Sequence, residues 1–337
     1  MNPKAKLISV AGIAVTRQAA LYAVSSVNIC RSILGGSAMT TGETAPSLWT
    51  KLPISLRAII SGLLIALIAA NVWRLLLLNL DEPLAAIVEA IFLALYVWWA
   101  SGGGPPGTTQ AARAKAFRRG RLSRRKWFWT VIAAIFFAAT VHASIVLLFR
   151  FVSYPMASFR KGYDFPFIPS LPLKWLAVVV SAISAGICEE TGFRGYMQRP
   201  IEQRHGARVA ILVSSLFFTA VHLTKGWAMA GMVPIVFGAG VLLGLLAWSS
   251  QSLIPGMIGH VLMDIGLFSY WWTGIAGDFA LLPISVTGVD RFFIITCATL
   301  LASLSILLLA ISRFRREGLA EISDNTSRKS QVENWRD

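Results

Sequence analysis

Long apolar runs dominate this sequence from residue 57 onwards. About eight runs of roughly 15 to 25 residues alternate with short polar segments, and a helix needs about 20 apolar residues to span a bilayer. Only 14% of the residues are charged, whereas a soluble domain carries about 25%. The pattern therefore predicts an all-α fold, a polytopic transmembrane helix bundle with about eight spans.

The loops between these runs differ in charge from one side to the other. The expected spans are residues 58–78, 84–100, 127–149, 173–197, 209–223, 227–248, 252–272 and 292–312. Loops on one side then hold 23 Lys and Arg residues and those on the other side hold 6. Because basic loops stay in the cytoplasm, this asymmetry predicts that both termini lie inside. We also expect Pro234 to kink the sixth span.

The net charge of +15 does not indicate a nucleic-acid partner, because the basic residues lie in loops and tails between the apolar runs. The strongest cluster is the loop 101–126, which carries eight Lys and Arg residues and no acid. Such a loop either binds acidic lipid headgroups or simply anchors the cytoplasmic side. We therefore expect membrane lipids as partners, no nucleic acid, and a multi-pass location in the cytoplasmic membrane; the sequence leaves the oligomeric state open.

Two charged residues lie within the first two spans. Arg74 and Glu89 are each about six residues, or roughly 9 Å of helix, from the turn that joins these spans. Similar depth on consecutive helices suggests a mutual ion pair. The alternative is that each side chain extends separately to the interface.

Two adjacent acids and an arginine follow the apolar run of the fourth span. Glu190 and Arg194 are four residues apart, so they share a helix face and can pair. Glu189 points about 100° away and is left available for chemistry. An ionisable group at bilayer depth is costly, which favours a functional reading. The alternative is a solvated pair just beyond the bilayer.

Two later spans add His222, His260 and Asp264. Counted from the helix ends, Glu189, His222 and His260 all lie at mid-membrane depth, and their depths differ by roughly 8 Å at most. Taken singly, His222 could be an interfacial residue and Asp264 could simply satisfy His260. Together they could activate a water molecule, with a carboxylate as the general base. Glu189, His222 and His260 also make a plausible zinc set with an open fourth position; a metal-free mechanism is the alternative.

These spacings resemble a known family. Glu189-Glu190-x-x-x-Arg194, Phe218-x-x-x-His222 and His260-x-x-x-Asp264 look like the three motifs of the CPBP intramembrane proteases. That family comprises CAAX prenyl endopeptidases and bacteriocin-processing enzymes, also called Abi or lysostaphin-resistance-protein-A-like proteins. The resemblance covers residues 172–272 and identifies the chain as a member of this family.

The resemblance implies roles for individual residues. Glu189 would activate the water and His222 would help to position it. His260 and Asp264 would line the oxyanion side, and Glu190, Arg194 and Phe218 would support the site. Many members have Asn where this chain has Asp264; an ionised Asp cannot donate a hydrogen bond, so here it either orients His260 or acts protonated. The family implies either a metalloprotease or a glutamate-dependent enzyme.

We therefore predict an intramembrane endopeptidase that acts on a membrane-associated or lipidated protein or peptide precursor. Other intramembrane proteases fit poorly, because the chain has no His-Glu-x-x-His, no Gly-x-Gly-Asp and no nucleophile elbow. One alternative is a non-catalytic bacteriocin-immunity or scaffold protein. Another is a proton-coupled transporter that uses Glu189 and His222 as a relay, although inverted repeats are not evident.

The sequence suggests five regions. Residues 1–56 would be a cytoplasmic segment, in which we favour Met39 as the true start over a cleaved signal or a surface helix. The others are N-terminal spans at 57–171, a CPBP protease core at 172–272, a last span within 273–312, and a basic cytoplasmic tail at 313–337, which we expect to be disordered.

Overall fold

The computed structural model describes residues 48–120, 122–152, 167–223, 227–277 and 281–333. The chain divides into two compact units, Met1–Pro53 and Ile54–Asp337. In the first unit the only described element is α2 (Leu48–Lys51). The predictions for residues 1–47, including Met39 as the start, lie outside the described residues.

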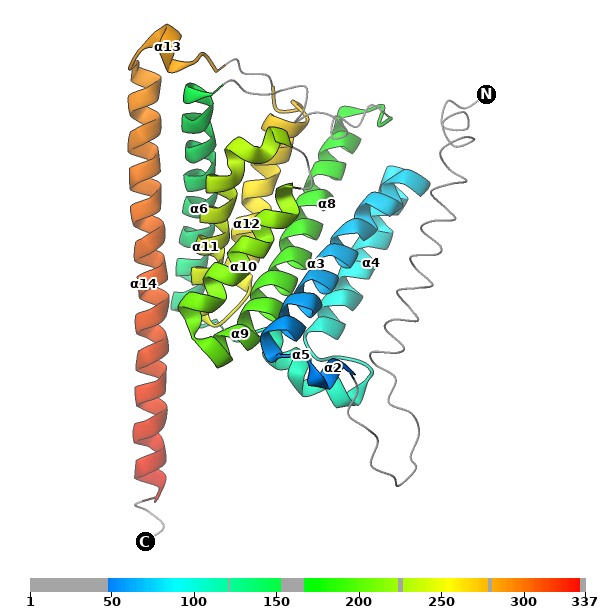
Figure 1. Ribbon diagram of the computed structural model, residues 1–337, viewed down its shortest axis with the longest axis vertical. Helices are drawn as coiled ribbons and strands as arrows, with labels where there is room; N and C mark the ends of the chain where they lie inside the picture. The colour runs from blue at the N-terminus through cyan, green and yellow to red at the C-terminus, as the bar shows by residue number, and fades with distance from the viewer. Residues whose placement is uncertain (1–47, 121, 153–166, 224–226, 278–280, 334–337) are drawn as a thin grey trace. The chain divides into compact units, whose positions relative to one another are not determined.

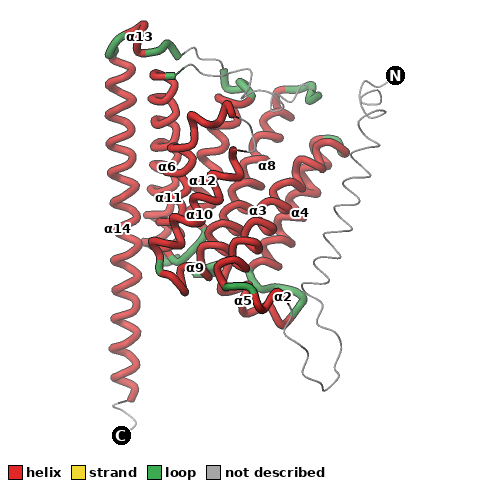
Figure 2. The backbone as a smooth tube through the Cα atoms, in the orientation of Figure 1, coloured by secondary structure: helices red, strands yellow, loops and turns green. Residues whose placement is uncertain are grey.

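The second unit is a bundle of helices (Figures 1 and 2). Within the described ranges it contains no β-strand, and a helix lies on each of the eight predicted spans. The predicted helical membrane bundle is thereby confirmed. The long helices are α3 (Ile54–Asn79), α4 (Glu82–Ala100), α6 (Arg124–Phe151), α8 (Leu171–Glu189), α10 (Ala207–Leu223), α11 (Val233–Ser250), α12 (Ile254–Gly266) and α14 (Arg291–Glu333). Shorter helices are η1 (Gly107–Thr109), α5 (Gln110–Ala116), α9 (Gln198–His205), η3 (Trp227–Met232) and α13 (Ile284–Thr287), and two π-helices are η2 (Glu190–Met197) and η4 (Leu267–Trp272).

Six helical segments are long and apolar enough to cross a membrane. The other two predicted spans are α10, with 17 residues, and α12, which has 13 residues and continues as η4. The count of eight spans and the inside position of both termini therefore stay predictions. The kink at Pro234 is wrong: η3 ends at Met232 and Pro234 lies in the first turn of α11, where proline's missing N–H costs no helical hydrogen bond.

Among the described residues, four clusters of buried apolar side chains hold the helices together, and two of them are larger than the others. The larger joins α6, α11, α12, η4 and α14, with Phe137, Leu243, Met263 and Leu307 among its members. The smaller joins α3, η2, α9 and α10. Helix α14 packs along α6, and it continues to Glu333, so the tail that we expected to be disordered begins as a helix.

Close contact between α3 and η2 depends on two glycines. A Cβ added at Gly192 would meet the backbone oxygen of Gly62 and the Cβ of Ala66, both at 2.5 Å. We expect Gly192→Ala to lower the free energy of unfolding by about 1–3 kcal/mol, the usual cost of overpacking. Denaturant titration of the detergent-solubilised protein measures this change. Gly238→Ala on α11 is the control, because nothing lies within 4 Å of its Cβ position. Equal stability of the two variants would contradict the prediction.

The basic loop 101–126 is partly built into the protein and is more than an anchor. Arg113 is buried, and its guanidinium donates to the carbonyl oxygens of Trp99, in the last turn of α4, and of Gly103 and Gly104, just beyond that helix. Lys115, Arg119, Arg124 and Arg125 are exposed. Among the basic residues of this loop that the structure describes, these four exposed ones remain available for the predicted contact with lipid headgroups.

Arg118 ties this loop to the helices beneath it. Its buried guanidinium pairs with the Glu202 carboxylate of α9 and donates to the carbonyl oxygens of Arg194 (3.2 Å) and Ala247 (3.3 Å). Burial lowers the pKa of Arg118, and the Glu202 carboxylate opposes that shift. The loop thus contacts the backbone of η2, the segment that begins at the second of the two acids.

The predicted ion pair between Arg74 and Glu89 is wrong. Glu89 is fully buried and accepts a hydrogen bond from the Ser184 hydroxyl of α8 at 2.7 Å, whereas Arg74 is exposed. The two residues lie at a similar depth, but their side chains face different neighbours. Their distances from the turn between the two helices do not determine the direction in which each side chain points.

At the opposite end, Asp290 caps α14. Its Oδ1 accepts the backbone N–H of Phe293 at 2.7 Å, and the Arg150 guanidinium donates to Oδ1 at 3.2 Å and to Oδ2 at 3.1 Å. The N–H of Phe293 and the Arg150 guanidinium together hold the pKa of Asp290 below its ordinary value. The carboxylate thus fastens the start of α14 to the end of α6.

This cap predicts an acid-dependent loss of stability. A carboxylate whose folded pKa is lowered stabilises the fold above its unfolded pKa, about 3.9 for Asp, and loses that contribution as the pH falls through the folded value. We expect the wild type to exceed Asp290→Asn in Tm by a constant amount from pH 7 to 5. That difference should shrink below about pH 4. A difference that stays constant down to pH 3 would contradict this reading.

Candidate active site

The two acids lie where α8 changes into the π-helix η2. Glu189 is the last residue of α8 and Glu190 the first of η2. Glu189 is half-buried and lines a pocket, whereas Glu190 is fully buried. Glu190 Oε1 accepts a hydrogen bond from Arg194 Nη1 at 2.9 Å, so the predicted pair of Glu190 and Arg194 is present.

Glu190 has a second partner that the spacing did not predict. The Nδ1 of His260 on α12 lies 3.0 Å from the same Glu190 Oε1, and an ionised carboxylate only accepts, so Nδ1 donates. Gly256, one turn before His260, makes room for this contact, since a Cβ there would meet Glu190 Oε2 at 3.0 Å. The glycine at position 256 is the sequence feature that could have indicated the contact between His260 and Glu190. Glu190 thus links η2 to the histidine of α12.

Phe218 separates and supports the polar groups. Its buried ring lies 4.6 Å from the His222 ring, 5.9 Å from the His260 ring and 4.4 Å from the Arg194 guanidinium carbon. Its backbone oxygen accepts from His222 Nδ1 at 2.8 Å. Because a carbonyl oxygen cannot donate, the hydrogen sits on Nδ1 and Nε2 is the accepting nitrogen of His222.

His260 and Asp264 face each other one turn apart on α12. His260 Nε2 lies 3.6 Å from Asp264 Oδ2, and both side chains are buried. This distance suits an ion pair but is too long for a hydrogen bond. Asp264 therefore has the position expected of a residue that orients His260.

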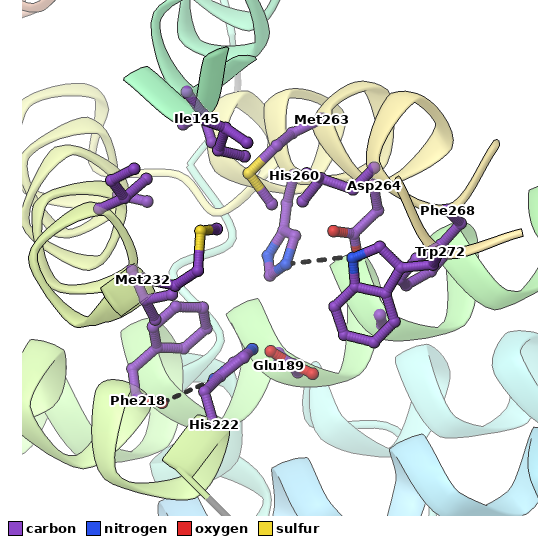
Figure 3. A pocket seen from close by; sticks show the side chains of 16 residues that line it. Ile145, Glu189, Phe218, His222, Met232, His260, Met263, Asp264, Phe268 and Trp272 are labelled. Carbon is purple, nitrogen blue, oxygen red and sulfur yellow. Dashed lines mark hydrogen bonds and ion pairs between the residues drawn. The ribbon is translucent and has the colours of Figure 1, made fainter. Parts of the chain in front are cut away.

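All four predicted catalytic residues line one pocket. It holds about 620 Å³ of empty space, counting the part open to its surroundings. Figure 3 shows Glu189 and His222 pointing towards one another, with His260 and Asp264 across from them. The rest of the wall is largely apolar and includes Val141, Ile145, Met232, Met263 and Phe268.

Sequence reasoning missed the outer parts of this wall. Val141 and Ile145 come from α6, a helix before the predicted core, and His142 beside them binds the Met263 carbonyl oxygen at 3.2 Å instead of facing the pocket. Trp272 at the end of η4 also lines the pocket. An apolar residue in an apolar span gives no sign in the sequence that it lines a pocket. The fold is therefore needed to identify these wall residues.

The zinc alternative fits these side chains poorly. Among the residues that the structure describes, no three His, Cys, Asp or Glu side chains are grouped so that they could hold a metal ion. One of the predicted ligands, His260, already directs Nδ1 to Glu190 and Nε2 to Asp264. We therefore derive no chemical step through a metal.

A comparison with protein families matches the segment that carries these motifs. Residues 171–266 match the family model described as type II CAAX prenyl endopeptidase Rce1-like. No curated protein and no solved structure matches the chain. The matched segment includes all three motifs and coincides with α8 to α12, the helices that supply the polar side of the pocket. The match over residues 171–266 supports the predicted membership of the CPBP family, that of the CAAX-type intramembrane proteases.

Proposed function

We propose that this protein is an endopeptidase of the cytoplasmic membrane that hydrolyses a peptide bond in a membrane-associated or lipidated protein or peptide precursor. The observation that carries the proposal is the pocket itself. One carboxylate and one imidazole, Glu189 and His222, face each other there beside the pair His260 and Asp264. The remaining wall is apolar, which suits a substrate with apolar side chains or an acyl or prenyl chain.

In this reaction Glu189 is the general base. Its carboxylate removes a proton from a water molecule while the water oxygen attacks the scissile carbonyl carbon. His222 accepts the other water hydrogen at Nε2, since Nδ1 is bound to the Phe218 carbonyl. This hydrogen bond fixes the direction in which the water attacks.

The attack places a negative charge on the former carbonyl oxygen, and the His260 side of the pocket stabilises it. Protonated Glu189 then gives its proton to the leaving nitrogen, and the C–N bond breaks. The products are a carboxylic acid and an amine, and Glu189 is restored. Glu190 and Arg194 take no part in the proton transfers; they hold His260 in place.

The experiment is a comparison of protein termini in membranes from cells that express the wild type or Glu189→Ala at equal levels. New C-termini and short released peptides that appear only with the wild type support proteolysis and identify the substrate. Identical termini, with both proteins folded, favour the non-catalytic immunity or scaffold function. A substrate found this way is then made as a fluorogenic peptide for kinetics with the purified protein.

A further inference from the structure

A series of hydrogen bonds connects the basic loop 101–126 to the pocket. It begins at Arg118, whose Nε donates to the backbone oxygen of Arg194 at 3.2 Å. The Arg194 side chain donates to Glu190 Oε1 at 2.9 Å, and His260 Nδ1 donates to the same oxygen at 3.0 Å. His260 in turn lines the pocket. A loop residue thus contacts one of the groups proposed to stabilise the oxyanion, through two buried residues of η2.

The middle of this series lies in the π-helix η2. Such helices are rare and occur mostly as single turns at functional sites, whereas η2 extends over eight residues. Contacts with neighbouring segments therefore have to stabilise it. Its winding matters for the site, because Glu189 directly precedes η2 and Glu190 is its first residue. An α-helix has fewer residues per turn, so rewinding η2 as an α-helix would turn its residues relative to Glu189 and to α12.

The Arg118 guanidinium joins η2 to two other helices. Besides its bond to the Arg194 oxygen, it donates through Nη1 to the backbone oxygen of Ala247 at 3.3 Å, near the end of α11. It also pairs with the Glu202 carboxylate of α9. A planar guanidinium has five N–H donors in a fixed arrangement and can serve all three acceptors at once, whereas a Lys ammonium is a compact point charge. Because the Arg118 side chain is buried, a side chain of another shape leaves some of these acceptors without their donor.

The backbone of the loop also fits closely against the helices. A Cβ added at Gly195 of η2 would meet the Ala116 oxygen at 3.1 Å. A Cβ added at Gly120 would meet the Gln251 oxygen at 2.6 Å. Arg118 itself has a φ of +50°, a conformation that few residues other than glycine adopt and that persists where the surroundings hold it. These contacts fix the backbone of Arg118, so its guanidinium has a set position against η2.

From these observations we infer that Arg118 is a positioning residue for the proposed hydrolysis. It keeps η2 in the winding that directs Glu189 to the pocket and holds Glu190 against His260. Arg118 is not among the residues that line the pocket, so it acts through η2 and not on the substrate. The inference rests on the proposed function, and it assigns a role to a loop residue outside the matched segment 171–266.

The first test makes the same substitution at two buried arginines of this loop. Arg118→Lys keeps the positive charge beside Glu202 but cannot keep all three contacts. We expect kcat with the fluorogenic peptide to fall roughly 10–10²-fold and KM to change only a few-fold, since catalytic groups are displaced while the walls that bind the substrate are kept. Arg113→Lys is the matched control, because Arg113 donates to carbonyl oxygens at the end of α4. This variant should lose stability and retain the wild-type kcat.

A second variant and a second measurement support the test. Arg118→Gln leaves no bare carboxylate, since Glu202 still pairs with Arg199 at 2.8 Å, and it serves where the Lys variant does not fold. The same loss of kcat is expected. Hydrogen exchange followed by mass spectrometry gives a readout besides activity. The amides of residues 190–197 should exchange faster in the Arg118 variants than in the wild type, whereas those of α14 should not change.

The outcomes distinguish the two levels of the argument. If Glu189→Gln loses activity while both Arg118 variants keep the wild-type kcat, the inference about Arg118 is overturned and the proposed function stands. Equal losses of kcat in Arg113→Lys and Arg118→Lys overturn it as well, because the effect then belongs to the whole loop, and so does a change confined to KM. If Glu189→Gln retains full activity, the proposed function itself fails.

Discussion

Glu189→Gln should lower kcat for peptide hydrolysis by roughly 10²–10⁴-fold, the usual contribution of a general base. The amide is isosteric with the carboxylate but cannot take the proton from water. Binding of the peptide should change little, because the substitution keeps the size and polarity of the side chain. Initial rates with the fluorogenic peptide, together with peptide affinity measured without turnover, check both expectations.

Glu89→Gln is the matched control for this substitution. Glu89 is a buried carboxylate at the interface of α4 and α8, bound to Ser184, and it does not line the pocket. Its loss should leave kcat within a few-fold of the wild type. Equal losses in the two variants would mean that any buried acid matters for folding, and would remove the case for Glu189 as the base.

The second large effect concerns stability. Arg194→Met should lower the free energy of unfolding by about 3–5 kcal/mol, the typical cost of leaving one partner of a buried ion pair uncompensated. Arg194 and Glu190 are both 0% exposed, so no water can replace the lost guanidinium. Denaturant titration in detergent measures the change.

The double variant Glu190→Gln/Arg194→Met should recover much of that loss, since no bare charge then remains in the interior. Arg199→Met serves as the control. Arg199 pairs with Glu202 at 2.8 Å but keeps 25% of its side chain exposed, and its loss should cost no more than about 1 kcal/mol. If Arg194→Met proves as mild as Arg199→Met, the buried pair does not stabilise the fold as described.

The helices and the polar groups of the pocket could be predicted because both leave a direct mark on the sequence. Long apolar runs predict the spans, and ionisable residues such as Glu189 and His260 within them are rare enough to be noticed. The pair Glu190–Arg194 followed from helical spacing, even though the segment winds as a π-helix, because residues four apart remain neighbours on either helix.

Contacts between distant helices could not be predicted in this way. Arg74 and Glu89 have matching depth, yet Glu89 turns to Ser184 on α8, because depth along a helix says nothing of the direction around it. The buried Arg118 looked like part of a solvated basic run. Arg118 and its exposed neighbour Arg119 stand in the same basic stretch of sequence. The contacts of Arg118 with the Glu202 carboxylate and with the carbonyls of Arg194 and Ala247 are what distinguish it.

The origin of the pocket's walls has a consequence for how such an enzyme can change its substrate. The polar groups proposed to break the bond come from α8, α10 and α12, whereas Val141 and Ile145 come from α6 and Trp272 from η4, both outside the matched segment. Part of the apolar wall thus lies on a stretch of the chain that carries none of the proposed catalytic groups, so substitutions at Val141 or Ile145 can alter which substrate fits while the three motifs stay unchanged.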